Sequence, residues 1–420
     1  MRAYLDIRYI AFKAGLWFAA HMVESEQDVA LEDTDRIEGR SALVNNTNAT
    51  LALASAVRST LGPRGSDKML VDENGEIVVT NDGVTVLETA KVEHPTANLL
   101  IATSSAQDRI ARDGTTTSVL LTAELLRNAL ELSRIGVHPT IIINGYQIAA
   151  EESLSQLDEI ARDASDEDLM AATATTMAGK IDTTLAETMT GLALEAARAL
   201  ENEEGGDDLE RIRIKRLKMT GGVAADSEII HGLMLRKQRL DFTTDGHSNG
   251  GKIAIIDGGL ENRELELDAQ IEIRSTGVLS GFQERKSAKL AEQVASLSSL
   301  GVDLVCVRDG IADEATPLLK EAGITAYRRF EQEDLERLSI LTNAKMVRDV
   351  NRISADDVGD YSKRSADKID DAWHVRIDGG RGAMTALLRG TTPIKREEVT
   401  RDFEDALGVA FRLDRQQKDL

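Results

Sequence analysis

The chain contains very little cysteine. Its 420 residues include one cysteine, Cys306, so no intrachain disulfide can form. Cys306 lies in the apolar run 302–307, which predicts a buried strand and favours a core thiol over a nucleophile. No apolar stretch is long enough to suggest a membrane span. Together these absences favour a reducing, cytoplasmic setting.

Several common catalytic motifs are also missing. The sequence has no Gly-x-x-x-x-Gly-Lys-Ser/Thr phosphate loop and no Gly-x-Ser-x-Gly nucleophile elbow. Its six histidines are scattered without the spacing of zinc ligands. A P-loop ATPase, a serine hydrolase and a zinc enzyme are therefore disfavoured.

Basic residues are outnumbered, and the formal net charge is −22. Such a chain repels nucleic-acid phosphates, which disfavours a general role in DNA or RNA binding. The acidic residues are spread along the sequence among apolar positions. Two interpretations are open: an ordinary solvated surface, or adaptation to high salt, where screening relieves the repulsion among carboxylates.

The length predicts two or three domains rather than one. Hydrophobic residues make up 42% of the chain but aromatic residues only 3%, a balance that suits helices and α/β layers. Residues 1–21 differ from the rest because they hold Tyr4, Tyr9, Phe12, Trp17 and Phe18. We interpret them as a non-native extension and expect the functional chain to begin at Met22.

The first third has a helical pattern interrupted by turns. Helices are expected over residues 43–61, 96–111, 116–132 and 139–162. Residues 69–71 and 77–79 are short β-prone runs on either side of an Asn-Gly pair, which is typical of a hairpin.

The middle of the chain predicts an α/β domain. Strands are expected at residues 253–257, 302–307 and 324–327, with helices at 278–300 and 313–322, and Gly323 as a left-handed cap. Residues 396–413 again have helical spacing, with apolar side chains on one face.

Three segments could carry chemistry. Residues 113–117 (Asp-Gly-Thr-Thr-Thr) place a carboxylate, hydroxyls and free amides at a helix start, which suits a phosphate with its magnesium ion. An Asx turn with a threonine cap explains the same residues. Residues 61–65 could let backbone approach a nucleotide, or could simply end a helix in a turn. Asp82 lies in a tight turn, and by itself it would be an ordinary solvated carboxylate.

The order and spacing of several motifs change this balance. Residues 57–72 and 80–83 are followed by His-Pro at 94–95, Gln-Asp at 107–108 and the 113–117 segment. Further motifs lie at residues 136–139, 145–146, 220–222, 226–228, 387–390 and 405–407. From about Gly39 to Leu407 this series resembles the archaeal group II chaperonins, the thermosomes, which are related to the eukaryotic TRiC chaperonin.

The resemblance implies a multidomain α and α/β fold, the chaperonin fold. Residues 22–163 would form the first part of a helical equatorial domain, and 164–226 the first part of a hinge-like intermediate domain. Residues 227–384 would form an α/β apical domain that binds substrate. Residues 385–420 would be the return of the intermediate domain and the start of the second equatorial part. The helix 278–300 would be the apical protrusion, with Val278, Leu279 and Phe282 near its tip.

The resemblance also implies an ATP site. Leu61, Gly62 and Pro63 would line the nucleotide, and Asp113 would hold Mg²⁺. Gly114, Thr115, Thr116 and Thr117 would contact the phosphates. Asp82 and Asp405 would orient or activate the attacking water. Lys180 would sense the γ-phosphate, or would be an ordinary surface lysine.

The function implied is that of an ATP-dependent chaperone subunit. Its partners would be unfolded polypeptides and other chaperonin subunits in a double ring, with neither nucleic acid nor membrane. Family members continue beyond the helix of Asp405 into further equatorial segments, so exposed apolar surface is expected on the equatorial part of this chain. Arg112, where the family usually has a small residue, is expected to crowd the phosphate loop.

Three hypotheses are open for this chain. It is a chaperonin ATPase, or a truncated remnant that binds unfolded chains without catalysis, or an unrelated nucleotide-dependent enzyme that shares only the phosphate motifs. A glycine-rich continuation of the gene would favour the first over the second. The third would need a chemistry for which the sequence offers no residues.

If the acidic composition is an adaptation to salt, the melting temperature rises with added KCl, because screening weakens repulsion among the carboxylates. Thermal unfolding between about 0.1 M and about 3 M KCl tests this. Sucrose is the control, since it favours the compact state without screening charge. A melting temperature that does not rise with KCl would contradict the interpretation.

Overall fold

The structure is a computed structural model that describes most of the chain from Gly39 onward. The described residues are 39–62, 64–71, 75, 77–90, 92–178, 181–200, 212–240, 246–261, 276–369, 371–380 and 382–418. Several sequence-based expectations lie outside them: residues 1–21, Pro63, Lys180 and the side chains of Val278, Leu279 and Phe282. The chain forms two compact units, residues 39–109 with 114–165, and residues 110–113 with 166–414.

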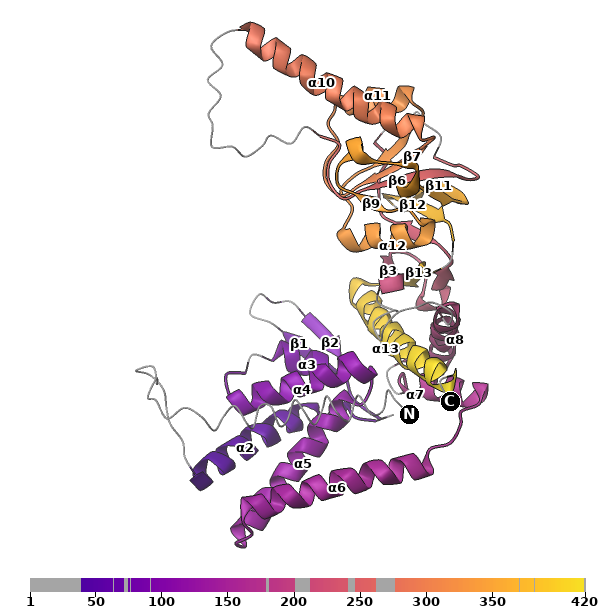
Figure 1. The fold of residues 1–420 in the computed structure, drawn as a ribbon. Coiled ribbons are helices and arrows are strands. Elements are labelled where there is room, and N and C mark those ends of the chain that lie inside the picture. The colour runs from indigo at the N-terminus through magenta and orange to yellow at the C-terminus, as the bar shows by residue number, and fades with distance from the viewer. Residues whose placement is uncertain are drawn as a thin grey trace. The chain divides into compact units, whose positions relative to one another are not determined.

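Helices dominate the first unit (Figure 1). They are α2 (Gly39–Val57), the 3₁₀ turn η1 (Arg58–Thr60), α3 (Gly83–Thr89), α4 (Pro95–Ala111), α5 (Thr115–Arg134) and α6 (Pro139–Ile160). The sequence pattern predicted the four long helices, and each is confirmed to within a few residues at its ends.

A hairpin interrupts these helices. Strands β1 (Lys68–Val71) and β2 (Ile77–Thr80) are antiparallel, with Leu70 opposite Val78. Gly75, between them, has a φ of 82°, which a side chain would disfavour. The hairpin predicted from the β-prone runs is confirmed.

The core of the first unit lies between α2, α3 and α5. Leu53, Ala54 and Val57 on α2 are buried in one cluster with Val86 and Leu87 of α3. The α2 residues recur at the spacing of one helix face, and α5 adds a matching stripe to the same cluster. Removing this apolar area from water stabilises the unit.

Apolar side chains are nevertheless exposed over this unit, as expected from the sequence. Those more than half exposed are Met69, Val71, Leu99, Leu121, Ile135, Ile141, Ile143, Ile148, Leu157 and Ile160. Five of these lie on α6, where Ile142 is the buried apolar residue.

The second unit contains a largely parallel sheet. Its strands are β6 (Gly251–Ile256), β7 (Leu304–Val307), β8 (Thr325–Tyr327), β9 (Met346–Val347) and the antiparallel β10 (Gly359–Tyr361). The order is β10-β6-β7-β8, and β9 pairs with the end of β6. The connecting helices are α10 (Thr276–Ser299), α11 (Ala315–Glu321) and α12 (Gln332–Thr342). Figure 1 shows α10 extending well past the sheet.

Both faces of this sheet are buried, as parallel sheets require. Ile253 and Ile255 belong to a cluster with α12, whereas Ala254 and Ile256 belong to a cluster with α10 and α11. The predicted strands at 253–257, 302–307 and 324–327 and the helices between them are confirmed with shifts of one to three residues. Gly323, at φ 71°, has the predicted left-handed conformation.

Cys306 occupies the middle of β7 and is fully buried. Burial raises the pKa of its thiol to about 12, because the thiolate would lose its hydration. The thiol therefore stays protonated at neutral pH, and its prediction as a core residue is confirmed.

A second, mixed sheet joins two segments that are far apart in the sequence. Strand β3 (Ile214–Met219) runs parallel to β13 (Met384–Arg389), and β4 (Glu228–Ile230) pairs with the other side of β13. Helices α7 (Asp166–Thr175), α8 (Thr183–Ala199) and α13 (Pro393–Lys418) share a hydrophobic cluster with these strands. The predicted helix 396–413 is confirmed within α13.

A third sheet contains β11 (Lys363–Ile369), β12 (Ala372–Asp378) and β5 (Leu233–Leu235), all antiparallel. The strands expected from the sequence include none of this sheet and none of β3, β4 and β13. β11 and β12 have little strand signal. Their sequences are rich in charged residues, so the alternation of apolar and polar positions is weak.

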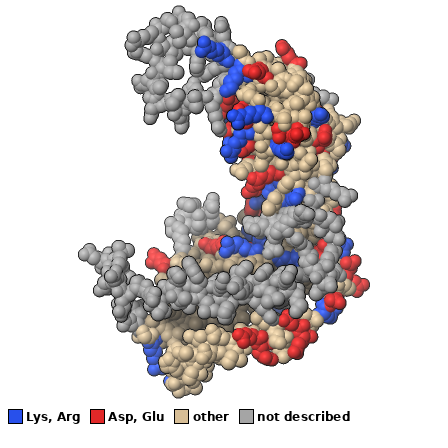
Figure 2. Space-filling view, viewed as in Figure 1, with Lys and Arg blue, Asp and Glu red and all other residues tan. Residues whose placement is uncertain are grey.

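Charged side chains of both signs are interspersed on the visible face (Figure 2). Many are paired, as in Arg198 with Asp166 and Arg127 with Glu124. Exposed pairs of this kind contribute about 0–1 kcal/mol each and weaken with salt. None of the helices in the described part of the chain is long and apolar enough to span a membrane.

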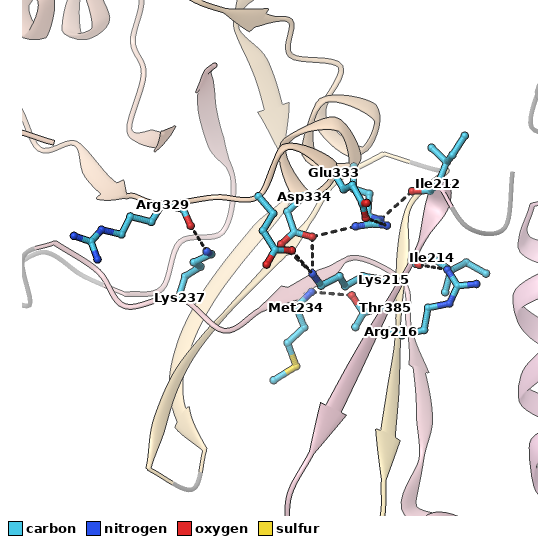
Figure 3. Close-up of polar contacts among 12 residues, drawn as sticks. Ile212, Ile214, Lys215, Arg216, Met234, Lys237, Arg329, Glu333, Asp334 and Thr385 are labelled. Atoms are coloured by element: carbon cyan, nitrogen blue, oxygen red, sulfur yellow. Dashed lines mark hydrogen bonds and ion pairs between the residues drawn. The ribbon is translucent and has the colours of Figure 1, made fainter. Parts of the chain in front are cut away.

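One ion-pair network is buried instead (Figure 3). Asp334, at the start of α12, accepts hydrogen bonds from Lys215 Nζ at 3.0 Å and from Arg337 Nη1 at 3.1 Å. Arg337 Nε also donates to the carbonyl of Ile212 at 2.9 Å. The Asp334 and Arg337 side chains are 4% and 7% exposed. The network therefore fastens α12 to the chain entering β3.

Replacing Asp334 with alanine would leave Lys215 and Arg337 without their shared carboxylate. We expect a loss of about 3–5 kcal/mol, because an uncompensated buried charge is costly. Hydrogen exchange in α12 and β3, with urea unfolding, measures the loss. Glu333→Ala is the matched control, since Glu333 is 76% exposed and its removal should cost under about 1 kcal/mol. Equal effects of the two substitutions would contradict the assignment of a buried pair.

Candidate nucleotide site

The N-terminus of α5 has the features of an anion-binding site. Gly114, with a φ of 75°, is the N-cap, and its carbonyl accepts the Ser118 amide at 2.9 Å. Thr115 and Thr116 are 8% exposed, whereas Thr117 is exposed. The first amides of a helix have no partner inside it, and the helix dipole adds positive potential there. Amides and hydroxyls at this position can bind a phosphate.

Asp82 is the N-cap of α3 rather than a loosely solvated loop residue. Its Oδ2 accepts hydrogen bonds from the Thr85 amide at 2.9 Å and from Thr85 Oγ1 at 2.7 Å. These bonds fix the orientation of the carboxylate. No described residue donates a hydrogen bond to Oδ1, so that oxygen can accept one from water. Thr85 is absent from the residues expected from the sequence, although Asp-x-x-Thr before an apolar helix is a capping signal.

Gly83 brings these two segments together. A Cβ atom built on Gly83 would lie 2.2 Å from Thr116 Oγ1 and 3.3 Å from Thr116 Cβ. The start of α3 therefore approaches the start of α5 at a distance that only glycine permits. Asp82 is consequently held beside the Thr115–Thr117 turn. Asp82 and Thr116 are both expected at the site from the sequence, but no sequence motif signals this approach.

The segment after η1 is a tight turn. The Gly65 amide donates to the Gly62 carbonyl at 2.8 Å, and the Ser66 amide donates to the Ser59 carbonyl at 2.8 Å. Gly62 has a φ of 84°, and Leu61 is 47% exposed. η1 lies along α5, where Arg58 Nη2 is 2.7 Å from Glu124 Oε1. The turn interpretation is confirmed, and the turn leaves Leu61 and Gly62 accessible.

Asp113 directly precedes the helix cap and is exposed. Within the described residues no group of three or more His, Cys, Asp or Glu side chains could hold a metal ion. A single carboxylate suits Mg²⁺, which is usually held by one or two carboxylates together with phosphate oxygens and water. The residues therefore fit a magnesium ion that arrives with a nucleotide.

Arg112 was expected to crowd the phosphate loop. It has a φ of 56°, which is unusual for a residue other than glycine. Residues 110–113 belong to the second unit by their contacts, and the Arg112 side chain lies against Gly408 of α13. A Cβ on Gly408 would come within 2.2 Å of Arg112 Cγ. Packing on α13 thus accounts for the position of Arg112.

Asp405 lies on α13, in the second unit. Its neighbours Ala406 and Leu407 are fully buried, and Asp405 is half-buried. Asp402, one turn earlier, is 4% exposed, so Asp405 is the more accessible of these two carboxylates. Asp82, by contrast, belongs to the first unit.

A pocket of about 580 Å³ also occurs in the second unit. It is lined by Ile212, Lys215, Arg216, Glu333, Glu336, Arg337 and Glu404. Its basic and acidic side chains are equal in number, and none of the residues predicted from the sequence lines it. It borders the buried network of Asp334, because Lys215 and Arg337 line it.

Comparison with known proteins identifies relatives along most of the chain. The model of the TCP-1/cpn60 chaperonin family matches residues 53–418. Thermosome subunit beta of Archaeoglobus fulgidus is 38% identical over 382 residues, which cover 90% of this chain and 70% of that protein. Thermosome subunits beta and alpha of Methanothermobacter thermautotrophicus are 37% and 36% identical over 393 residues, which cover 92% of this chain and 72% of each.

Replacing Gly83 with alanine tests the close approach of α3 and α5. We expect a loss of about 1–3 kcal/mol in stability and weaker nucleotide binding, because Thr116 must move. Urea unfolding and nucleotide titration measure the two effects. Gly145→Ala is the control, since a Cβ there meets open space in α6 and should stabilise by up to about 1 kcal/mol.

A second substitution separates stability from binding. Adding Thr116→Ala to Gly83→Ala removes the hydroxyl that would clash with the new Cβ atom at position 83. The double variant should therefore regain stability without regaining nucleotide affinity. Full nucleotide affinity in Gly83→Ala alone would contradict the assignment of this contact to the site.

Proposed function

The chain belongs to the TCP-1/cpn60 chaperonin family, and from this membership we propose how its own residues bind and hydrolyse ATP. Members of the family are ATP-dependent chaperonin subunits that act in protein folding. The observation that carries the proposal is the contact of Gly83 with Thr116, which holds the Asp82 carboxylate beside the free amides of α5. This arrangement combines a phosphate site and a fixed carboxylate.

The nucleotide would lie along the turn after η1 and the start of α5. Leu61, Gly62 and Pro63 would line it, with Leu61 offering apolar surface and Gly62 close backbone approach. The amides of residues 114–117 and the threonine hydroxyls would hold the phosphates. Asp113 would hold Mg²⁺, which supplies charge neutralisation of the phosphate oxygens. Lys180, outside the described residues, is proposed as a contact of the γ-phosphate.

Asp82 and Asp405 would act on the attacking water. Oδ1 of Asp82 would accept a hydrogen bond from it, because Oδ2 is held by Thr85. Phosphoryl transfer depends mainly on positioning and electrostatic stabilisation, so orientation of the water is the larger contribution. Asp405 would supply a second carboxylate when the segment bearing α13 moves, which would couple hydrolysis to closure.

Three domains are proposed along the chain. The helical part, residues 22–163, would be equatorial, and residues 1–21 would be a non-native N-terminal extension. Residues 164–226 and 385–420 would contain the intermediate domain, an assignment supported by the cluster that α8, β3, β13 and α13 share. Residues 227–384 would be the apical domain, supported by the parallel sheet with helices on both faces.

The partners proposed are unfolded polypeptides and other chaperonin subunits in a double ring. Neither nucleic acid nor a membrane is proposed as a partner, given the net charge of −22. The setting proposed is the cytoplasm of a salt-loving archaeon. A passive binder of unfolded chains is the alternative, favoured by the exposed apolar side chains on α6.

Conservative substitutions separate catalysis from folding. Asp82→Asn keeps a side-chain oxygen for the Thr85 amide, so it should fold normally and bind ATP while hydrolysis falls about 10²-fold or more. Asp405→Asn should have a similar effect. Asp113→Ala should weaken Mg²⁺-dependent nucleotide binding itself. Phosphate release and nucleotide titration, with and without Mg²⁺, measure these effects.

Native mass by light scattering in molar KCl, with and without Mg-ATP, distinguishes the two candidates. A ring-sized particle that hydrolyses ATP supports the chaperonin ATPase. A monomer that binds unfolded protein without hydrolysis supports the passive binder. Wild-type hydrolysis by both Asp→Asn variants would refute the roles given to Asp82 and Asp405.

A further inference from the structure

Three exposed arginines in the second unit have no acidic partner within the described part of the chain. They are Arg236, Arg328 and Arg329. Other arginines of this unit are paired, as in Arg308 with Asp257, Arg348 with Asp257 and Arg376 with Asp378. In a protein with a net charge of −22, unpaired guanidinium groups that gather in one place need an explanation.

Backbone pairing brings these arginines together. The chain leaving β5 runs beside β8, where the Leu240 amide donates to the Ala326 carbonyl at 3.0 Å. Lys237 Nζ donates to the carbonyl of Arg329, and its ammonium group lies 5.0 Å from the centre of the Phe330 ring. Lys237 therefore lies against Arg329, and Arg236 and Arg328 are their neighbours along the two paired segments. We call Arg236, Lys237, Arg328 and Arg329 the arginine surface.

The backbone of Arg329 is held in an uncommon conformation. Its φ is 61°, in the left-handed region that costs most side chains about 1–2 kcal/mol. The flanking bonds hold it there: the Arg329 amide donates to the Asp309 carbonyl at 3.1 Å, and the Phe330 amide donates to Val307 at 3.2 Å. In Figure 3 its guanidinium extends away from Asp334. The group is thus presented outward from a fixed backbone.

The acidic side chains that act on Lys237 have other basic partners, and Asp309, whose carbonyl accepts the Arg329 amide, is paired with Arg308. Asp334 is occupied by Lys215 and Arg337, and Glu331 lies 3.7 Å from Lys215. Burial holds the pKa of Lys237 below its ordinary value, while Asp334 and Glu331 act in the opposite direction. The outer guanidinium groups of Arg328 and Arg329 remain available to a partner.

We propose that the arginine surface binds acidic segments of unfolded polypeptides. This inference rests on the proposed function, since it names a class of client for the same chaperone. Guanidinium groups bind carboxylates bidentately, and two or three neighbouring Asp or Glu side chains match the number of arginines. A nucleic acid fits less well, because its regular charge array would meet an acidic protein beyond the patch.

The test is peptide binding to the full chain, measured by fluorescence anisotropy. One labelled peptide carries Asp and Glu, and a second of equal length has Gln and Asn at those positions. We expect the acidic peptide to bind about tenfold more tightly, and the difference to shrink as KCl is raised. R328E/R329E should abolish this preference and leave binding of the neutral peptide within about twofold.

The control is R348E/R352E, which makes the same change in net charge at two arginines of the same unit. These are 85% and 84% exposed and already lie near Asp257 and Asp349. We expect the acidic preference to be retained. A second variant, Arg328→Gln with Arg329→Asn, removes the charge while keeping a residue that tolerates a positive φ. This variant keeps the test valid if R328E/R329E fails to fold.

The outcomes separate this inference from the proposed function. Binding of neither peptide by the wild-type chain would count against the chaperone role itself. Equal binding of both peptides, or loss of the preference in the control, would overturn the arginine surface alone. Tighter binding of a single-stranded oligonucleotide than of the acidic peptide, lost in R328E/R329E, would overturn it in favour of nucleic acid.

Discussion

The parallel pairing of β3 with β13 is the constraint on which the second unit depends. The two strands pair from Ile214 with Met384 to Met219 with Arg389, although more than 160 residues separate them. The segment between these strands, which includes the parallel sheet and α10, must therefore begin and end at this one pair of strands. The chain enters and leaves this excursion through neighbouring strands, so the excursion behaves as an insertion in the layer formed by α8 and α13.

Successive side chains of β13 point to opposite faces of the sheet and therefore pack into two different hydrophobic clusters. Ala386 and Leu388 face the cluster of α8 and α13, whereas Leu387 packs with Met234 of β5. Thr385 fastens the second side, because its hydroxyl donates to the Gly232 carbonyl and accepts from the Met234 amide. With Asp334 and Arg337 binding α12 to the entry of β3, the insertion is held by a strand, a hydroxyl and a buried ion pair (Figure 3).

Local patterns predicted most of the long helices, the hairpin and the central strands of the parallel sheet, because the information for them is local. They did not predict the helices α3, α7, α8 and α12 or the strands of the other two sheets in the second unit. The apolar run around Cys306 is sufficient to predict a strand, and Gly323 is sufficient to predict a helix cap. β11 and β12 escaped prediction because their pairing, such as Arg364 with Ile377, stabilises sequences whose own pattern is polar. Asp82 and Thr116 were expected at the site from the chaperonin resemblance, because residue type alone left each an ordinary turn or cap residue. Their approach through Gly83 depends on packing between α3 and α5, which no short motif encodes.

The placement of the two proposed catalytic carboxylates has a mechanical consequence. Asp82 is held by a helix cap on the core of α2, α3 and α5, whereas Asp405 is carried by α13 on the separate core that includes α8. Packed cores resist gradual deformation, so each carboxylate is fixed relative to the core of its own unit. In the proposed mechanism, a change in the position of one unit therefore alters the distance between the carboxylates without disturbing either core. In that proposal, hydrolysis would depend on domain position at little cost in stability, as coupling of ATP hydrolysis to closure requires.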